Sequence, residues 1–313
     1  NASNMLEDQM PPVSTINLFD LEQSVIDWDL YYKNHEIKTV EKYDLRPHQK
    51  SAHDAVVKGL ADAERGKLIL ACGTGKTFTS LRIAETLAGK GKKVLFLVPS
   101  LALLSQTLNE WTQQAKLPLR NFAVCSDSDI GKQKISEDDR VVAIRSELDF
   151  PSTTNAKSLA NSIKGLHNDE YMTVVYSTYH SINVLSDAQM SYNIGEFDLI
   201  ICDEAHRTTG ATFDGEDESN FVMVHNDDHI MAKKRLYMTA TPRIYSEDAK
   251  ATDGVAVVSM DNEKLFGREL FVLNFSTAVS LGLLVDYKVI VLSVEESAIN
   301  RRLQSMLKDD SNQ

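Results

Sequence analysis

Residues 67–77, with the sequence KLILACGTGKT, join an apolar run to a turn whose residue types suit phosphate binding. Gly73 and Gly75 lack a Cβ atom, so the backbone can turn its N–H groups inward and approach a phosphate closely. Lys76 can place an ammonium group on the outer phosphates, and the start of a following helix adds its positive dipole. The Thr77 hydroxyl can ligate Mg²⁺. The segment predicts a phosphate loop with the binding residues Gly73, Thr74, Gly75, Lys76 and Thr77.

The strict form of this motif has a further glycine five residues before Gly75, where this chain has Leu70. The substitution weakens the match to the pattern but leaves the glycine-rich turn, the lysine and the hydroxyl in place. An ordinary turn between a strand and a helix remains the alternative interpretation of this stretch alone. The phosphate-loop prediction therefore depends on a second group of residues elsewhere in the chain.

That second group is the acidic pair Asp203 and Glu204, which follows the apolar run of residues 197–202, FDLIIC. An aspartate at the end of a buried strand can hold Mg²⁺, usually through water, and an adjacent glutamate can polarise the water that attacks a γ-phosphate. Carboxylates in this position are also common as helix caps, so the pair gains its meaning from the phosphate loop. Together the two groups predict Lys76, Asp203 and Glu204 as catalytic residues and Thr77 and Asp203 as Mg²⁺ ligands.

Both groups need a scaffold that brings distant residues to one place. Apolar runs of strand length alternate with segments of helical spacing, and this alternation is typical of a parallel sheet with helices on both faces. We expect an α/β fold with a doubly wound, mostly parallel sheet whose strands end at the motifs. The expected strands are residues 68–71, 94–98, 121–125, 141–144, 172–176, 197–202, 234–238 and 288–294, and the expected helices are 51–63, 78–88, 101–111, 277–284 and 295–308.

The composition fits a protein of the reducing cytoplasm. The 313 residues are 42% hydrophobic, enough for a sizeable core, and no stretch approaches the length of a membrane span. The three cysteines, Cys72, Cys125 and Cys202, lack the spacing of a zinc site, so we expect free thiols and a cytoplasmic location. The net charge of −12 argues against a general affinity for nucleic acid but permits a site with locally gathered basic groups.

Short motifs follow one another between residues 45 and 243 in the order LRPHQ, ACGTGKT, VPSLALLSQ, STYHS, DEAHR and TATPR. In this order they resemble the motifs of the superfamily 2 DEAH-type helicases and translocases, whose first motor domain has the RecA-like fold of the phosphate-loop NTPases. The motifs are most similar to those of the ATP-driven motor subunits of restriction enzymes, the ResIII-like domains. The resemblance implies ATP and Mg²⁺ as cofactors.

The resemblance also implies roles for residues outside the phosphate loop. Gln49 of LRPHQ would bind the adenine edge, since an amide both donates and accepts hydrogen bonds, with Arg46 or Tyr43 covering the ring. For Gln49 the alternative is a helix cap or a solvent-facing side chain. The residues expected to couple the nucleotide site to nucleic acid are His206, Thr239 and Thr241. Those expected to contact the nucleic-acid backbone are Ser100, Gln106, Ser177 and Thr178.

We expect three parts along the chain. Residues 1–44 form an N-terminal extension, with 1–4 as a possible expression remnant, 45–270 form the RecA-like ATP-binding domain, and 271–313 form a linker and the start of a truncated second motor domain. Residues 126–169 are expected to be a polar, partly ordered excursion. The motifs of a second motor domain are missing from these residues, including an arginine worth roughly 10³ to 10⁵ in rate in related enzymes. The chain is therefore expected to bind ATP and to hydrolyse it weakly.

The resemblance as a whole implies the ATP-binding motor domain of a DNA helicase or translocase, from a restriction-modification system, that couples ATP hydrolysis to movement on DNA. The expected partners are DNA in duplex form, a second RecA-like domain, and nuclease or methyltransferase domains of the full-length protein; no membrane partner is expected. One alternative is a DNA-repair or RNA helicase that separates strands. Another is a nucleotide-gated binding or scaffold module without useful hydrolysis.

Two further polar groups are not assigned to this function. His225 and His229, with Asp227 and Asp228, have metal-ligand chemistry, but they lie in a polar insertion and are expected to form a solvated loop. The basic residues 233–235 are expected to be the exposed start of a strand rather than a contact with DNA.

Overall fold

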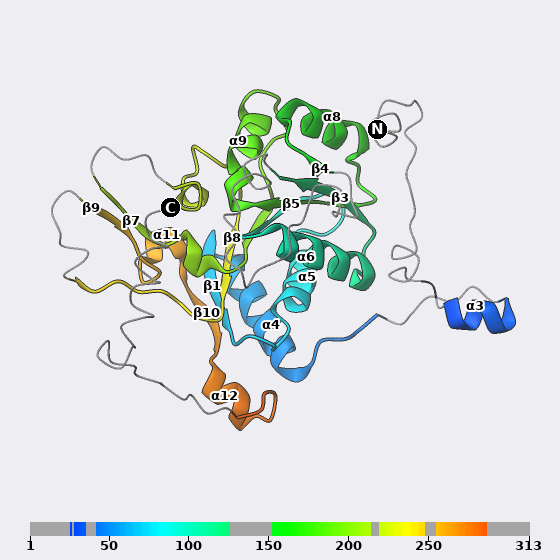
Figure 1. The fold of residues 1–313 in the computed structure, drawn as a ribbon, viewed down its shortest axis with the longest axis horizontal. Helices are drawn as coiled ribbons and strands as arrows, with labels where there is room; N and C mark the ends of the chain where they lie inside the picture. Colours follow the sequence, from blue (N-terminus) through cyan, green and yellow to red (C-terminus); the bar gives the residue numbers. More distant parts are fainter. Residues whose placement is uncertain are drawn as a thin grey trace, which may run out of the picture.

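The computed structural model describes residues 26, 28–35, 42–125, 152–213, 219–247 and 255–286. Its centre is an eight-stranded sheet in which every pair of neighbouring strands is parallel (Figure 1). From one edge to the other, the strands are β10 (Arg268–Leu273), β1 (Arg65–Leu70), β8 (Arg235–Thr239), β6 (Leu199–Cys202), β2 (Lys93–Val98), β5 (Met172–Thr178), β3 (Leu119–Val124) and β4 (Ser152–Thr153). The described α-helices are α3 (Trp28–Asn34), α4 (Pro47–Ala61), α5 (Lys76–Leu87), α6 (Leu101–Gln114), α8 (Ala156–Leu166), α9 (Ile182–Met190), α11 (Glu263–Phe266) and α12 (Phe275–Ser280).

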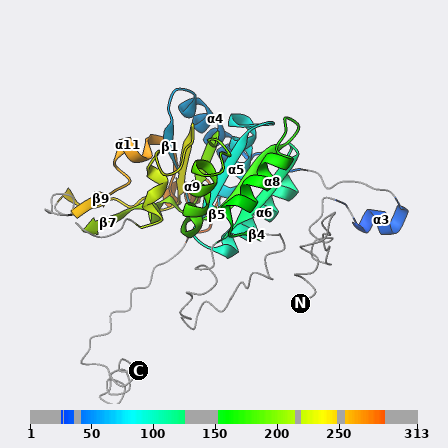
Figure 2. The ribbon, with the colours of Figure 1, turned by 90° about the horizontal axis from the view of Figure 1, so that it is seen from above.

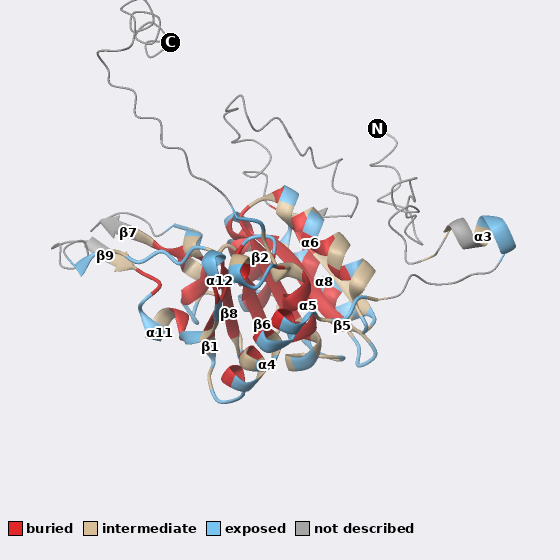
Figure 3. Ribbon diagram, turned by 90° about the horizontal axis from the view of Figure 1, so that it is seen from below, coloured by how far each residue is buried: buried red, intermediate tan, exposed pale blue. Residues whose placement is uncertain are grey.

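Helices cover both faces of the sheet: α4, α5 and α6 pack on one face, and α8 and α9 pack on the other. In β2, Val94, Phe96 and Val98 belong to the core on the first face, and Leu95 and Leu97 belong to the core on the second. This division arises because successive side chains of a strand point in opposite directions. Figure 3 shows the central strands almost wholly buried. The predicted doubly wound, mostly parallel fold is confirmed.

In the part of the chain that the structure describes, three 3₁₀ turns and a two-stranded sheet lie outside the main sheet. The 3₁₀ turns η2 (Tyr179–Ser181) and η3 (Ala205–Thr208) come after β5 and β6, and η4 (Val222–His225) precedes β8. β7 (Gly210–Phe213) and β9 (Val255–Val258) pair antiparallel and lie to one side of the main sheet (Figures 1 and 2).

Local capping fixes where α4 and α6 begin. The backbone N–H of Arg46 donates to the side-chain oxygen of Gln49 at 2.9 Å, and Pro47 takes the first helical position, where an N–H is not needed. α4 therefore begins earlier than the predicted start at residue 51. At α6, the Ser100 hydroxyl accepts a hydrogen bond from the N–H of Leu103.

The stretch from residue 152 to 169 is more ordered than predicted. It contains β4 and α8, and α8 buries Leu159, Ala160 and Ile163 on one face. These residues recur at helical spacing, so the amphipathic pattern was present in a segment whose polar composition favoured an irregular excursion.

The sheet continues past the domain boundary predicted at residue 270, because β10 pairs with β1 as far as Leu273. The strands predicted at 141–144 and 288–294 and the helix predicted at 295–308 lie outside the described residues. Within the described ranges, no helix is long and apolar enough to cross a membrane.

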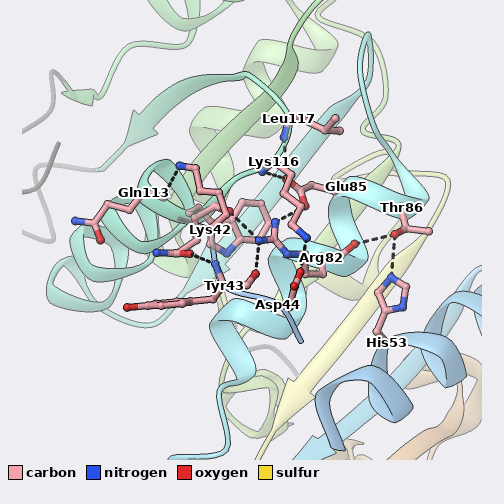
Figure 4. Close-up of polar contacts among 12 residues, drawn as sticks. Lys42, Tyr43, Asp44, His53, Arg82, Glu85, Thr86, Gln113, Lys116 and Leu117 are labelled. Carbon is pink, nitrogen blue, oxygen red and sulfur yellow. Dashed lines mark hydrogen bonds and ion pairs between the residues drawn. The ribbon is translucent and has the colours of Figure 1, made fainter. Parts of the chain in front are cut away.

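A buried ion pair on α5 fixes the segment that leads into α4. The guanidinium of Arg82 donates to Glu85 at 2.6 Å, to the carbonyl of Tyr43 at 3.0 Å and to that of Gln114 at 2.9 Å. Both side chains of the pair are less than a tenth exposed, at 7% and 9%. Figure 4 shows Arg82 directed at Tyr43, with Glu85 between α5 and the turn after α6.

The acid of this pair holds the turn between α6 and β3. Glu85 Oε1 accepts from the backbone N–H groups of Lys116, at 2.5 Å, and Leu117, at 3.0 Å. Lys42 donates from its ammonium group to the carbonyl of Gln113, which ties the same entering segment to the end of α6. The ion pair therefore joins two separate segments, the one at Tyr43 and the one at residues 114–117, to the helix that follows the phosphate loop.

Replacement of Glu85 by Ala should destabilise the fold by about 3 kcal/mol, because it leaves the buried Arg82 guanidinium without its counter-charge. The measurement is urea unfolding followed by circular dichroism. The matched control is Lys116→Ala, which removes the exposed ion pair with Asp44 and should leave stability close to that of the unmodified chain. Equal midpoints for the two variants would contradict this role of the pair.

Candidate active site

The loop between β1 and α5 has the backbone geometry of a phosphate cradle. Gly73 and Gly75 have φ of +81° and +85°, a region that side chains other than glycine seldom adopt. Between them, Thr74 is buried, and its hydroxyl donates to the carbonyl of Ala71 at 2.7 Å. A Cβ atom at Gly75 would lie 2.2 Å from Gln49 Nε2, so any other residue there would displace the Gln49 amide as well as strain the backbone.

The functional side chains of the loop stand at the start of α5. Lys76 is the first residue of this helix, and its ammonium group lies 3.4 Å from the carbonyl of Leu70. Thr77 is half-buried, and its carbonyl accepts a hydrogen bond from Trp111 Nε1 at 3.1 Å. The helix start therefore carries the lysine and the hydroxyl that the sequence assigned to phosphate and Mg²⁺.

The acidic pair stands at the same edge of the sheet. β8 lies between β1 and β6, so the ends of β1 and β6 are about 10 Å apart at the usual strand spacing. Burial and the neighbouring Glu204 charge raise the pKa of Asp203 to about 6, while the Lys76 ammonium acts in the opposite direction. The sheet order therefore places the two motifs at the same edge of the sheet, two strands apart.

Glu204 adopts a conformation that is rare for residues with a side chain. Its φ is +48° and ψ is +45°, and its N–H donates to Asp203 Oδ1 at 3.0 Å. Such backbone conformations cost of order 1–3 kcal/mol and cluster at functional sites. The left-handed turn brings the Glu204 carboxylate to 3.3 Å from His206 Nδ1.

The three predicted coupling residues form one network. His206 Nδ1 lies 2.9 Å from the Thr239 hydroxyl, and the same hydroxyl accepts from the N–H of Thr241 at 3.1 Å. Burial lowers the pKa of His206, partly offset by the Glu204 charge, so the imidazole is neutral at pH 7. The network therefore joins the acidic pair at the end of β6 to the end of β8.

Gln49, predicted to bind adenine, has both ends of its amide engaged by the protein. Its oxygen accepts from Arg46 N–H, and its Nε2 donates to the carbonyl of Thr74 at 3.2 Å. The side chain is buried against the phosphate loop. Gln49 is thus a helix cap, as the alternative interpretation expected, and the adenine contact stays a prediction.

The four residues predicted to contact nucleic acid are not equivalent in the structure. Gln106 is exposed on α6, and Ser100 caps that helix. Ser177 and Thr178 are fully buried at the end of β5, where the Thr178 hydroxyl lies 3.0 Å from that of Ser181. The hydroxyls of Ser177 and Thr178 have internal hydrogen-bond partners, so their contact with nucleic acid stays a prediction.

The interpretation of the polar insertion as a solvated loop was wrong for His225. Its ring is buried and stacks on Tyr237, with Nδ1 at 3.0 Å from the phenol oxygen, and burial lowers its pKa to about 4. Asp227 pairs with Arg65 at 2.6 Å and with Arg235 at 2.5 Å. Arg235, expected to be exposed, is buried as well, so the insertion packs on the starts of β1 and β8.

One residue of the site was missed in the sequence. His48 Nε2 lies 3.0 Å from the carbonyl of Thr74, beside the contact from Gln49. The available signal was its position next to Gln49 in the LRPHQ motif.

A glycine-rich loop between a parallel strand and a helix, facing an acidic pair two strands away, defines a phosphate-loop nucleotide-binding domain of the RecA-like kind. The chain belongs to the family described as "Type III restriction enzyme, res subunit", which matches residues 42–244. A second family, described as "Restriction endonuclease", matches residues 1–38.

Two solved structures of Type ISP restriction-modification enzymes are similar to this chain. The ATP-dependent enzyme LlaBIII bound to DNA is 38% identical with a TM-score of 0.72, and the match covers 99% of this chain and 20% of that one. A nuclease-deletion mutant of LlaGI in complex with a DNA substrate mimic is 36% identical with a TM-score of 0.59, and the match covers 77% of this chain and 21% of that one. The chain is therefore a helicase-type motor domain similar to those of Type ISP enzymes.

The curated relatives of this chain are also named as helicases. A probable helicase, A859L, of African swine fever virus (isolate Tick/South Africa/Pretoriuskop Pr4/1996) is 28% identical over 278 residues, which is 88% of this chain and 27% of the relative. The same helicase from isolate Tick/Malawi/Lil 20-1/1983 is also 28% identical, over 270 residues, 86% of this chain and 26% of the relative. The chain thus spans about a quarter of the length of these relatives.

Replacement of Asp203 by Asn should stabilise the nucleotide-free, metal-free protein at neutral pH. In the folded protein the pKa of Asp203 is raised from 3.8 to about 6. Below pH 3.8 the carboxyl is protonated in both the folded and the unfolded state, so it does not change the free energy of unfolding. As the pH rises from 3.8 to about 6, the group destabilises the folded state increasingly. Above that pH the cost is constant at about 3 kcal/mol. Asn keeps the Oδ1 acceptor for Glu204 without the charge.

The check is urea unfolding in EDTA at pH 7.5 and pH 4.5, with the exposed Asp228→Asn as the control. The gain from Asp203→Asn should be present at pH 7.5 and should shrink towards pH 4.5. An equal effect at both pH values would show that the ionised carboxylate carries no such cost.

Proposed function

We propose that this chain is the ATP-binding motor domain of a DNA translocase of a restriction-modification system, which uses ATP with Mg²⁺ to move on duplex DNA. The observation that carries the proposal is the meeting of the phosphate loop and the acidic pair at the carboxyl ends of β1 and β6. Hydrolysis by these 313 residues alone is expected to be weak, and full turnover is assigned to the complete protein.

In this proposal each residue of the site has a separate task. Lys76 neutralises charge on the outer phosphates, with the inward N–H groups of the loop beside it. Thr77 and Asp203 would hold Mg²⁺, because a hydroxyl and a buried carboxylate are the oxygen ligands that this ion prefers. Bound Mg²⁺ would supply positive charge against the phosphate oxygens. Glu204 accepts the proton of the attacking water, and the neutral His206 holds its carboxylate in place.

The network of His206, Thr239 and Thr241 supports the proposed coupling, because it joins the end of β6 to the end of β8. Gln49 is proposed to bind adenine, and Ser100, Gln106, Ser177 and Thr178 remain the proposed contacts with the DNA backbone. Because Ser177 and Thr178 are buried, their side chains would have to become exposed before they could reach DNA. In this proposal, nucleotide binding causes that rearrangement.

Further domains belong to the proposal as well. The match of residues 1–38 to a restriction endonuclease family supports a nuclease upstream of the motor. We propose an N-terminal extension at 1–44, a motor domain at 45–270 whose last strand extends to Leu273, and then a linker and the start of a second motor domain up to residue 313. Cys125 and Cys202 are buried and form no disulfide, which is compatible with the proposed cytoplasmic location.

A strand-separating helicase is the second candidate, because the curated relatives are named as probable helicases. The full-length protein distinguishes the two. If the protein is a duplex translocase, blunt duplex DNA should stimulate its ATP hydrolysis, and a labelled duplex should stay intact. Release of the labelled strand, with stimulation by single-stranded DNA, would favour the helicase.

Replacement of Lys76 by Ala should abolish stabilisation of this chain by ATP. ATP with Mg²⁺ at 100 times its dissociation constant should stabilise the unmodified chain by about 2.7 kcal/mol. The Lys76→Ala variant should melt at the same temperature with and without ATP, whereas Lys92→Ala, an exposed lysine before β2, should respond like the unmodified chain. Retained ATP stabilisation in the Lys76 variant would count heavily against the site.

Replacement of Glu204 by Gln should separate binding from hydrolysis. The amide keeps the size and contacts of the side chain but cannot take a proton, so ATP affinity should remain within a factor of about two while DNA-stimulated hydrolysis by the full-length protein falls by about 10² to 10⁴. The measurements are nucleotide titration and phosphate release. Unchanged hydrolysis would favour the scaffold interpretation of this domain.

A further inference from the structure

Two neighbouring side chains of α4 contact a single carbonyl of the phosphate loop. His48 Nε2 and Gln49 Nε2 lie 3.0 Å and 3.2 Å from the oxygen of Thr74. A carbonyl oxygen can only accept hydrogen bonds, so both nitrogens donate. The two side chains are buried, at 9% and 6% exposure, which removes competition from water.

This contact determines which way a peptide group of the loop faces. In a trans peptide the carbonyl and the following N–H point in opposite directions, so the Thr74 carbonyl and the Gly75 N–H are antiparallel. With the carbonyl directed at α4, the Gly75 N–H is directed away from α4, towards the side where the loop can receive a phosphate. The left-handed φ of Gly75, +85°, permits this turn of the backbone.

The donation also determines the state of the His48 ring. Its neutral form has the proton on Nε2, so Nδ1 is an acceptor, and this buried atom has no hydrogen-bond partner within the described part of the chain. An unsatisfied buried polar atom is unfavourable, and Phe or Leu would avoid it. The hydrogen bond to the loop is the feature of His48 that an apolar residue cannot supply.

We propose that His48 is a positioning residue for the phosphate loop: with Gln49 it sets the orientation of the Thr74–Gly75 peptide, and it thereby sets affinity for the triphosphate rather than for the base. This inference rests on the proposed ATP-binding function and adds a second residue of α4 to it. α4 then acts on both parts of the nucleotide, through Gln49 on the base and through His48 and Gln49 on the phosphates.

The competing interpretation is that His48 binds the adenine base through Nδ1. A pair of polar variants separates the two. The amide nitrogen of Gln takes the place of Nε2 and can reach the Thr74 carbonyl, whereas the shorter Asn replaces Nδ1 and cannot. His48→Gln should therefore retain the loop contact, and His48→Asn should lose it.

The experiment measures the affinity of this chain for ATP, GTP and inorganic tripolyphosphate, each with Mg²⁺, by calorimetric titration. His48→Asn should weaken all three by a similar factor of about ten, the value of one buried hydrogen bond, and His48→Gln should stay within about threefold of the unmodified chain. Melting temperatures of both variants, taken without ligand, check that they are folded to the same extent.

The matched control is His53→Asn. His53 lies on the same helix, and its Nε2 contacts the Thr86 hydroxyl of α5 at 2.9 Å, so this variant removes a bond between α4 and α5 outside the loop. Its affinities should be unchanged. An equal loss from His53→Asn would mean that helix packing, and not the loop carbonyl, is responsible.

Other outcomes would overturn the proposal. Weaker ATP binding with unchanged tripolyphosphate binding, or recovery by Asn in place of Gln, would assign His48 to the base. Unchanged affinities in both variants would end the positioning role while leaving the ATP site intact. If the unmodified chain bound none of the three ligands, the proposed function itself would be wrong, which is a separate result.

Discussion

The parallel pairing of β1, β8 and β6 is the constraint on which the site depends. Parallel strands end at the same edge, and the register aligns Ile69 with Thr239 and Cys202 with Tyr237. The chain turns directly after Cys202, and His206 in this turn contacts both Glu204 and Thr239 at the end of β8. Residues more than 120 positions apart in the sequence, Lys76 and Asp203, meet because of this arrangement of strands.

The same arrangement of strands buries the charged carboxylate of Asp203. Asp203 is buried, and its pKa is raised by burial and by Glu204, while Glu204 itself has a strained backbone. Each of these features opposes folding. Their cost is offset by the packing of a sheet covered on both faces, so the fold can maintain a site whose charges would be relieved by a bound cation.

The sequence predicted the elements whose signal is local. β2 was clear because VLFLV is apolar at every position, as expected for a strand buried on both faces. The burial of His225 was not predictable in this way, since it depends on Tyr237 and Phe266, which are distant in the chain. Residue type alone likewise could not separate a phosphate-binding hydroxyl from the internal one at Thr178.

Among the site residues, too, some were predictable from the local sequence and others depend on contacts between distant segments. The glycines, the lysine and the paired carboxylates each have other uses, but together and at the ends of apolar runs they indicated the phosphate loop and the acidic pair. Gln49 and His48 have many uses, and their contact with the Thr74 carbonyl depends on how α4 packs on α5.

α5 links these observations, because it carries functional residues at its start and a buried ion pair further along. Lys76 and Arg82 are six residues apart, or about 9 Å along the helix. Arg82 holds the carbonyl of Tyr43, just before α4, and α4 in turn holds the Thr74 carbonyl just before α5. The contacts form a closed circuit through the loop, α5, the segment at 42–44 and α4. These hydrogen bonds connect the phosphate loop to the segment at 42–44 through both α4 and α5.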